Sequence, residues 1–324
     1  MIMAKTTPWR RIAITTGAMA AVLLLAASFR FVQSRGLFAS VEDKAPAACH
    51  AVANISGVTA IAPDLRDNVV YIATRQGEVY AYLNGVVVKF SGVPKDFHPL
   101  ALSVDHPAPD ASRLFAVFAH GDGTYAMATF EVGAGKLIET GRLTTDQLTD
   151  PADLVASDPM RFYLVNRHGS RTGFGRWLDD TFLLPRAEVL YFDGMKFVKV
   201  AERLNSPSGI ALSPDGGHLY VAQDVTRALA SFSRNDFSGA LDNAELLTLP
   251  AAPRKITVAP DGSLIVAAWP KRGTGAVYRV GVANGVPQAA DLLYSTRGEE
   301  ITAAAETGGH LLIGTEKRLI DCRL

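Results

Sequence analysis

Cysteine is nearly absent from this chain of 324 residues, and neither sign of charge predominates. There are two cysteines, and Lys plus Arg and Asp plus Glu both number 32. No Cys/His spacing typical of a zinc site, no phosphate-binding loop and no dinucleotide motif occurs. No basic stripe interleaved with aromatic residues occurs either, which excludes a nucleic-acid partner. A hydrophobic content of 48% excludes a disordered chain.

A repeated hairpin pattern organises the sequence. Residues 208–223, SGIALSPDGGHLYVAQ, place two apolar runs on either side of a Pro-Asp-Gly-Gly turn. Alternating apolar residues beside such a turn indicate two antiparallel strands. Similar stretches recur at a spacing of roughly 45 to 55 residues, which is typical of propeller blades. The six copies begin at Val58, Pro99, Asp153, Ser208, Lys255 and Ile301. We therefore predict an all-β fold, a six-bladed β-propeller.

The N-terminal residues predict a membrane segment. Residues 12–29 are apolar and uncharged, with Lys5, Arg10 and Arg11 before them and Arg30 after them. This is either a secretory signal or an uncleaved anchor, and the length of the run favours a transmembrane anchor. We assign residues 1–32 to this segment, 33–48 to a linker and 49–324 to the propeller. The positive residues precede the run, so the propeller is expected outside the cytoplasm, in the periplasm or the extracellular space.

The two cysteines stand near the two ends of the predicted propeller. Cys49 opens it and Cys322 lies close to its last residue. A propeller joins its first and last blades to close the ring, so a disulfide between them would close a very long loop. An extracytoplasmic location favours this disulfide, and two buried free thiols are the alternative.

The first residue of each innermost strand is expected at one end of the central channel. Alignment of the repeats on their turns gives a ring of six residues, with Gly57 as the alternative to the first: Thr59, His98, Ala152, Ser208, Arg254 and Glu300. Residues 166–188 interrupt the repeat and predict a long loop over one mouth of the channel. That loop is expected to cover a pocket or touch the membrane, and an ordinary blade connection is the alternative.

Several motifs resemble the paraoxonase/arylesterase family and, more distantly, gluconolactonase and strictosidine-synthase-like propellers. The end LLIGTEKRLIDCRL resembles the family's closing strand with its terminal cysteine. The hairpin at 208–223 resembles the fourth-blade motif. FHPLALS and FAHGDG resemble the two histidine stretches, and FYLVNRHG resembles the Asn-x-His loop. The resemblance covers most of the chain and implies the same six-bladed fold.

The resemblance implies a histidine pair but not the calcium chemistry of that family. His98 and His120 match the paired histidines. The positions of the catalytic-calcium ligands are occupied instead by Thr59, Ala152, Ser208, Arg254 and Lys255. Among the positions of the structural-calcium ligands, Asp153 retains the acidic residue of the family, whereas Ala60 stands where the family has an acid in the first blade. Calcium prefers six to eight oxygen ligands and is repelled by cationic side chains, so we expect no calcium cofactor.

Two functions remain open at this point. The first is hydrolysis of an ester or lactone by a diverged site, with His98 and His120 as base and partner and Arg254 stabilising the oxyanion. The second is a non-catalytic propeller that binds a small carboxylate or an envelope protein. The residues expected to contact a ligand are Lys255, Ser208, Glu300 and Thr59. Arg254 and Glu300 are expected to form an ion pair in the channel, which either fills the space left by the metal or belongs to the functional site.

Overall fold

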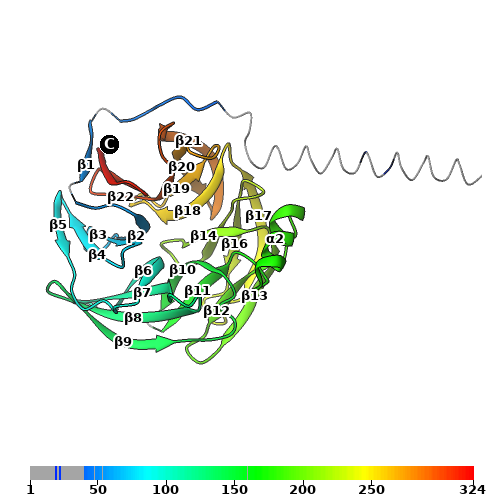
Figure 1. Cartoon of the computed structure of the whole chain (residues 1–324), viewed down its shortest axis with the longest axis horizontal. Coiled ribbons are helices and arrows are strands. Elements are labelled where there is room, and N and C mark those ends of the chain that lie inside the picture. Colours follow the sequence, from blue (N-terminus) through cyan, green and yellow to red (C-terminus); the bar gives the residue numbers. More distant parts are fainter. Residues whose placement is uncertain (1–18, 20–21, 23–39, 47, 53, 159) are drawn as a thin grey trace, which may run out of the picture.

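The computed structural model describes residues 19, 22, 40–46, 48–52, 54–158 and 160–324. The described residues form six four-stranded antiparallel sheets, which surround a central axis as blades (Figure 1). The predicted six-bladed β-propeller is therefore confirmed. Within the described part of the chain, no helix is long and apolar enough to cross a membrane. The predicted anchor at 1–32 lies outside the described residues, apart from Met19 and Val22.

Each blade is numbered by its innermost strand, and the other strands follow outward. Blade 1 contains β2 (Val58–Asp64), β3 (Val69–Thr74), β4 (Val79–Leu83) and β5 (Val86–Lys89). Blade 2 contains β6 (His98–Ala108), β7 (Ala111–Ala119), β8 (Tyr125–Gly133) and β9 (Lys136–Leu143). Blade 3 contains β10 (Pro151–Asp158), β11 (Arg161–Asn166), β12 (Ala187–Phe192) and β13 (Phe197–Leu204). Blade 4 contains β14 (Pro207–Leu212), β15 (His218–Gln223), β16 (Ala228–Arg234) and β17 (Leu241–Thr248). Blade 5 contains β18 (Ala252–Val258), β19 (Leu264–Trp269), β20 (Gly275–Ala283) and β21 (Val286–Thr296). Blade 6 contains β22 (Ile301–Thr307), β23 (His310–Thr315), β24 (Leu319–Arg323) and β1 (Ala48–Val52).

The core lies between adjacent blades. The second strand of a blade is buried along nearly its whole length, as in β15 and β23. Such a strand packs against a neighbouring blade on each face, which explains why these segments read as continuous apolar runs. The turns before them use the residues that tight turns favour. In blade 4, for example, the side chain of Asp215 accepts the Gly217 N–H at 3.0 Å, and Gly216 has φ of 73°.

The two ends of the propeller meet in blade 6. Strand β1 pairs with β24, and Cys49 lies directly opposite Cys322 in the register. These two residues form a disulfide across 273 positions of sequence, so the predicted bridge is confirmed. Ahead of β1, the main chain of Lys44 exchanges hydrogen bonds of 3.0 and 2.8 Å with Ser295 of β21. Part of the segment assigned as linker thus packs against blade 5.

Every innermost strand carries one irregularity near its start. The pairing with the second strand skips a single residue in each blade, as in a β-bulge. The skipped residues are Thr59, Leu100, Ala152, Ser208, Arg254 and Thr302. The ring predicted from sequence is therefore corrected in two blades, because Leu100 and Thr302 take the places given to His98 and Glu300. The predicted positions were found by counting residues back from each turn, which is correct only where the hairpins have the same length. They do not, since β6 has a second register shift between Asp105 and Ala108.

Candidate functional site

The side chain of Lys255 lies in the central channel and links three blades. Its Nζ lies 2.9 Å from Asp153 Oδ1 and donates to the carbonyls of Ala152 at 2.6 Å and Leu100 at 3.2 Å. The side chains of Lys255 and Asp153 are only 13% and 8% exposed. An ammonium has three protons to donate, and three oxygens surround this one. The channel thus holds a cation that belongs to the protein.

Burial dominates the electrostatics of this pair. It raises the pKa of the Asp153 carboxyl and lowers the pKa of the Lys255 ammonium, and each partner opposes the effect on the other. The second oxygen of Asp153 accepts the Ile210 N–H at 3.1 Å. Because a buried charge without a partner is costly, each of these groups depends on the other to remain charged.

Arg254 lies at the channel mouth, which we define as the end where the innermost strands begin. Its guanidinium donates to Asp224 Oδ2 at 2.8 Å and stacks over the Trp269 ring at 4.1 Å from the centroid. Burial, followed by the charge of Arg167, lowers the pKa of Arg254 to about 10. Arg254 faces a cavity of about 760 Å³, which we call the arginine cavity.

The expected ion pair between Arg254 and Glu300 does not form. Glu300 also lines the arginine cavity, but its Oε1 accepts the Gly273 N–H at 2.8 Å, and Arg254 pairs with Asp224. The physical reason is that Glu300 stands before the bulge of its blade, whereas Arg254 occupies the bulge of its own.

The two predicted histidines are brought together by a carboxylate that the sequence did not reveal. Asp96 Oδ2 lies 3.2 Å from His120 Nδ1, and Asp96 Oδ1 lies 3.5 Å from His98 Nε2. The N–H of Gly121 also donates to Asp96, at 3.2 Å from Oδ1. His120 is 21% exposed in its side chain, and His98 is 52% exposed. Among the described residues, no hydrogen-bond partner is found for the Nε2 atom of His120.

His120 lines a second cavity at the mouth, of about 500 Å³, which we call the histidine cavity. Arg171 and Arg176 line it too. Arg176 donates to the Thr149 carbonyl at 2.7 Å, and Arg171 pairs with Asp146 at 3.1 Å. Arg254 is not among its lining residues. The structure therefore groups His98 with His120 and places Arg254 in the other cavity.

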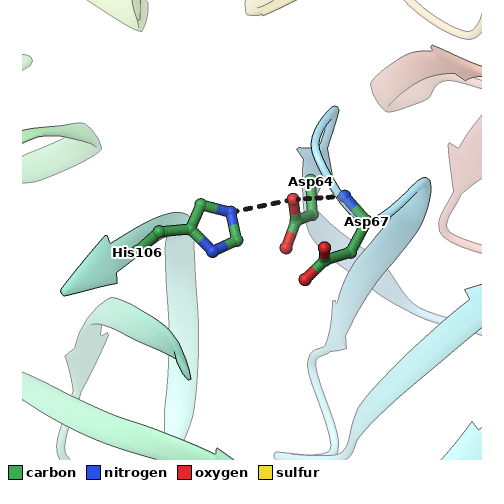
Figure 2. Close-up of side chains that lie close together, drawn as sticks. All are labelled: Asp64, Asp67 and His106. Atoms are coloured by element: carbon green, nitrogen blue, oxygen red, sulfur yellow. Dashed lines mark hydrogen bonds and ion pairs between the residues drawn. The ribbon is translucent and has the colours of Figure 1, made fainter. Parts of the chain in front are cut away.

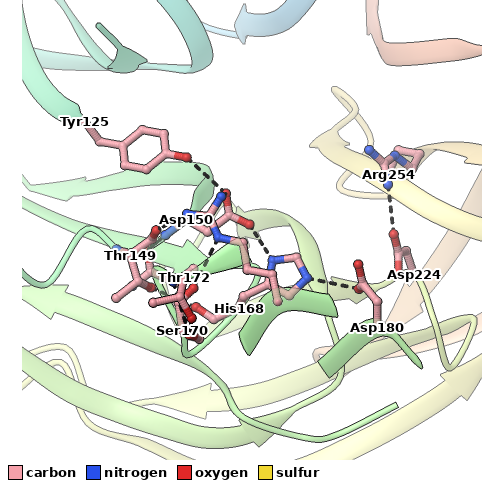
Figure 3. A network of polar contacts seen from close by, with 11 residues as sticks. Tyr125, Thr149, Asp150, His168, Ser170, Thr172, Asp180, Asp224 and Arg254 are labelled. Carbon is pink, nitrogen blue, oxygen red and sulfur yellow. Dashed lines mark hydrogen bonds and ion pairs between the residues drawn. The ribbon is translucent and has the colours of Figure 1, made fainter. Parts of the chain in front are cut away.

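A polar network connects the two cavities, because Tyr125 lines the histidine cavity and His168 and Asp180 line the arginine cavity. Figure 3 shows its side chains. His168 is held by Asp150 at 2.5 Å from Nδ1 and by Asp180 at 3.0 Å from Nε2. Tyr125 donates to Asp150 at 3.3 Å. Burial lowers the pKa of His168, but the two carboxylates outweigh it and raise the pKa to about 9. The imidazole is therefore a cation at neutral pH.

The predicted loop at 166–188 contains this network and a helix, α2 (Gly173–Phe182). Thr172 caps the helix by accepting the Gly175 N–H at 3.1 Å. Asp180 of α2 reaches His168, and Leu183 after the helix lines the arginine cavity. The segment thus forms part of the mouth. Its aromatic residues Phe174, Trp177 and Phe182 are exposed.

Two other predicted ligand-contacting residues are engaged with the backbone. The Ser208 hydroxyl donates to the Pro253 carbonyl at 2.7 Å, and the side chain is buried. The Thr59 hydroxyl donates to the Ala73 carbonyl at 3.3 Å. Neither residue lines the two cavities at the mouth.

A group of two carboxylates and a histidine stands where β2 and β6 end, on the side away from the mouth. Figure 2 shows its three side chains. Asp64, Asp67 and His106 place ligand atoms within 4.8 Å of one another. Asp64 Oδ1 lies 3.0 Å from His106 Nε2 and accepts the N–H groups of Arg66 and Asp67, both at 3.1 Å. The group closes the turn after β2 and ties it to β6.

A family model described as Arylesterase matches residues 42–324. The chain belongs to this family. The matched residues include all six blades and both cavities at the mouth, so the family covers the whole candidate site.

Known relatives of this arylesterase-family chain are similar over part of their length. Serum paraoxonase/arylesterase 2 of Canis lupus familiaris is 24% identical over 176 residues, which are 54% of this chain and 49% of the relative. The Homo sapiens protein of the same name is 29% identical over 127 residues, 39% of this chain and 36% of the relative. The chain thus spans about half the length, or less, of the relatives it matches.

Solved structures show the same fold at low identity. A calcium-binding protein, regucalcin, from Agrobacterium tumefaciens superposes with a TM-score of 0.59 at 16% identity, covering 87% of this chain and 95% of its own. A gluconolactonase from Xanthomonas campestris gives 0.58 at 17% identity, covering 88% and 99%. At this identity the likeness shows the fold alone.

Sequence reasoning missed the acids that orient the histidines. Asp96 lies two residues before His98, and Asp150 lies next to the start of β10, yet neither belongs to a recognisable motif. His168 stood in the quoted FYLVNRHG stretch and could have been singled out there. The arginines of the histidine cavity stood in the loop that interrupts the repeat.

Proposed function

We propose that this protein hydrolyses small esters or lactones without calcium, with His120 as the general base. The observation that supports this most directly is the contact of 3.2 Å between His120 Nδ1 and Asp96. A carboxylate at one ring nitrogen fixes the tautomer, so that the other nitrogen can accept a proton. Family membership and relatives named paraoxonase/arylesterase support the same class of reaction.

The histidine cavity contains groups suited to each step of such a reaction. His120 Nε2 takes a proton from water as the water oxygen bonds to the carbonyl carbon. The imidazolium then gives that proton to the alcohol oxygen as the carbon–oxygen bond breaks, leaving an acid and an alcohol. The carbonyl oxygen becomes negative in between, and Arg176 or Arg171 in the same cavity would stabilise that charge.

The residues of the channel do not fit the calcium chemistry of the family. Calcium needs six to eight oxygens, several of them anionic. Here Asp153, the one acid kept from that set, contacts the Lys255 ammonium at 2.9 Å. The nearby carbonyls of Ala152 and Leu100 accept from the same ammonium. A divalent ion at this place would face a fixed positive charge, so no step of the proposed reaction passes through calcium.

We also propose an extracytoplasmic propeller held at a membrane by residues 1–32. The disulfide between Cys49 and Cys322 supports an oxidising compartment. The apolar run at 12–29, with positive residues ahead of it, supports the anchor and its orientation.

Turnover of phenyl acetate and γ-butyrolactone by the purified full-length chain tests the hydrolase. Turnover should be the same with about 1 mM calcium, a concentration that occupies extracellular calcium sites, as with a chelator. His120→Gln should lower kcat/KM by roughly 100-fold or more, and Asp96→Asn should lower it less. His50→Gln is the matched control, because His50 is 69% exposed, lies in the outermost strand β1 and lines neither cavity.

Three results would overturn the proposal. Turnover abolished by the chelator would mean that calcium is used after all. Turnover unchanged in His120→Gln would remove the base. Absence of turnover on any ester or lactone would favour the alternative of a binding propeller.

A further inference from the structure

Arg167 is a partly buried charged residue at the mouth whose side chain makes no hydrogen bond or ion pair with the described residues. It directly follows β11 and lines the arginine cavity. Its Nε atom is buried and, among the described residues, makes no hydrogen bond. A buried donor without an acceptor destabilises the folded chain, and more so when it is charged. The native protein would keep such a group if a ligand supplies the acceptor.

The acids around Arg167 are already engaged. Asp224 binds Arg254 at 2.8 Å, and Asp180 binds His168 at 3.0 Å. Asp150, whose charge interacts with Arg167 at longer range, holds His168 at 2.5 Å. Each of these carboxylates has its own cation, and Glu300, the remaining acid of the cavity, accepts the Gly273 N–H at 2.8 Å. Among the described residues, none of these acids makes a hydrogen bond or ion pair with Arg167.

Other cations face the same cavity. Lys271 and Arg272 line it, and Arg254 lies close enough to Arg167 for their charges to repel. Arg254 is fixed by Asp224 on one edge and by the Trp269 ring below it. Trp269 is itself fixed, because its Nε1 donates to the Ile301 carbonyl at 2.7 Å. A guanidinium held in this way is preorganised to bind an anion.

We propose that the arginine cavity is a binding site for a small organic carboxylate, held between Arg167 and Arg254. The planar fork of a guanidinium matches the two oxygens of a carboxylate. Trp269 and Leu183 give the cavity apolar wall for the organic part of the ligand. Its volume of about 760 Å³ lies in the range usual for small-molecule sites. The site shares no lining residue with the histidine cavity, so this inference goes beyond the proposed hydrolase.

Anion binding by the full-length chain tests the proposal without any turnover. Benzoate is the probe, benzyl alcohol its neutral counterpart and inorganic phosphate the competing oxyanion. Benzoate should bind saturably by calorimetry and raise the melting temperature, whereas benzyl alcohol should do neither. Arg167→Gln should weaken benzoate binding at least 10-fold, and Arg167→Lys should weaken it less. Arg161→Gln is the matched control, because Arg161 stands at the other end of β11, lines neither cavity and is 42% exposed; it should bind benzoate as the unaltered chain does.

The unliganded variant gives a second readout. Because Arg167→Gln removes a positive charge that Arg254 repels, its melting temperature without anion should equal or exceed that of the unaltered chain. Benzoate binding that is absent, or that is unchanged in Arg167→Gln, would overturn the proposal. Tighter binding of phosphate than of benzoate would overturn the carboxylate class. A chain that binds benzoate but hydrolyses nothing would leave this site standing and remove only the hydrolase.

Discussion

The channel lysine yields the sharpest test of how the propeller is held together. Replacing Lys255 with Met keeps a similar volume but removes the ammonium. Asp153 would then be a buried carboxylate without a counter-charge, and the carbonyls of Ala152 and Leu100 would lose their donor. Breaking one side of a buried ion pair costs about 3–5 kcal/mol. We expect Lys255→Met to lower the free energy of unfolding by about that amount.

The pH dependence of this loss has a definite sign. Burial already raises the pKa of Asp153, and removal of its partner raises it further. The folded variant then binds a proton that the unfolded chain releases, so its stability falls as pH rises. Urea unfolding should therefore show a smaller loss for Lys255→Met at pH 5 than at pH 8.

Two further variants make the test decisive. Asp153→Leu combined with Lys255→Met removes both charges and should recover most of the lost stability, because a buried pair contributes little beyond an apolar one. Lys196→Met, at an exposed position, should change stability by less than about 0.5 kcal/mol. If Lys255→Met behaved like Lys196→Met at both pH values, the channel lysine would not carry the role assigned to it.

Two other predictions follow from the closure and from the buried network. Cys49→Ala with Cys322→Ala should lower the free energy of unfolding by roughly 4–6 kcal/mol, because the disulfide restricts a very long loop in the unfolded chain. Guanidinium unfolding measures this loss, and a loss below about 1 kcal/mol would contradict the prediction. His168 has its folded pKa raised to about 9 by Asp150 and Asp180, so its stabilisation should be complete below about pH 6.5 and lost as pH rises to about 9. Unfolding at pH 6 and pH 9.5 should show this decline, and His168→Gln should flatten it; an equal decline in the variant would count against the network.

The repeated hairpins could be predicted from sequence, because turn residues and the alternation of apolar and polar residues along a strand are local patterns. The hairpin at 208–223 predicts β14 and β15 almost to the residue. Cys49 and Cys322 were placed together by the requirement that a propeller close its ring. The bulge in each innermost strand was not readable, because it arises from packing around the axis. For this reason His98 and Glu300 were expected at the level of the bulges, although each precedes the bulged residue of its strand by two positions.

The candidate site was less predictable than the fold. His98, His120, Arg254 and Lys255 were singled out and all lie in the channel or at its mouth. Most of their partners are distant in sequence: Asp224 comes from the turn after β15, Asp153 from another blade, and Asp96, although two residues before His98, is 24 positions from His120. Such pairings depend on how blades are placed around the ring, and no local pattern records them.

The seam in blade 6 also bears on how this protein is made. Among the described strands, its outermost strand β1 is synthesised first and its neighbour β24 last. Until β24 has been synthesised, the blades can form only an open arc in which β1 has no partner strand. The thiols of Cys49 and Cys322 come together only when β24 pairs with β1, so an external oxidant can take their two electrons and form the disulfide only once the ring has closed. Until then the open arc exposes unpaired strand edges that can join other chains.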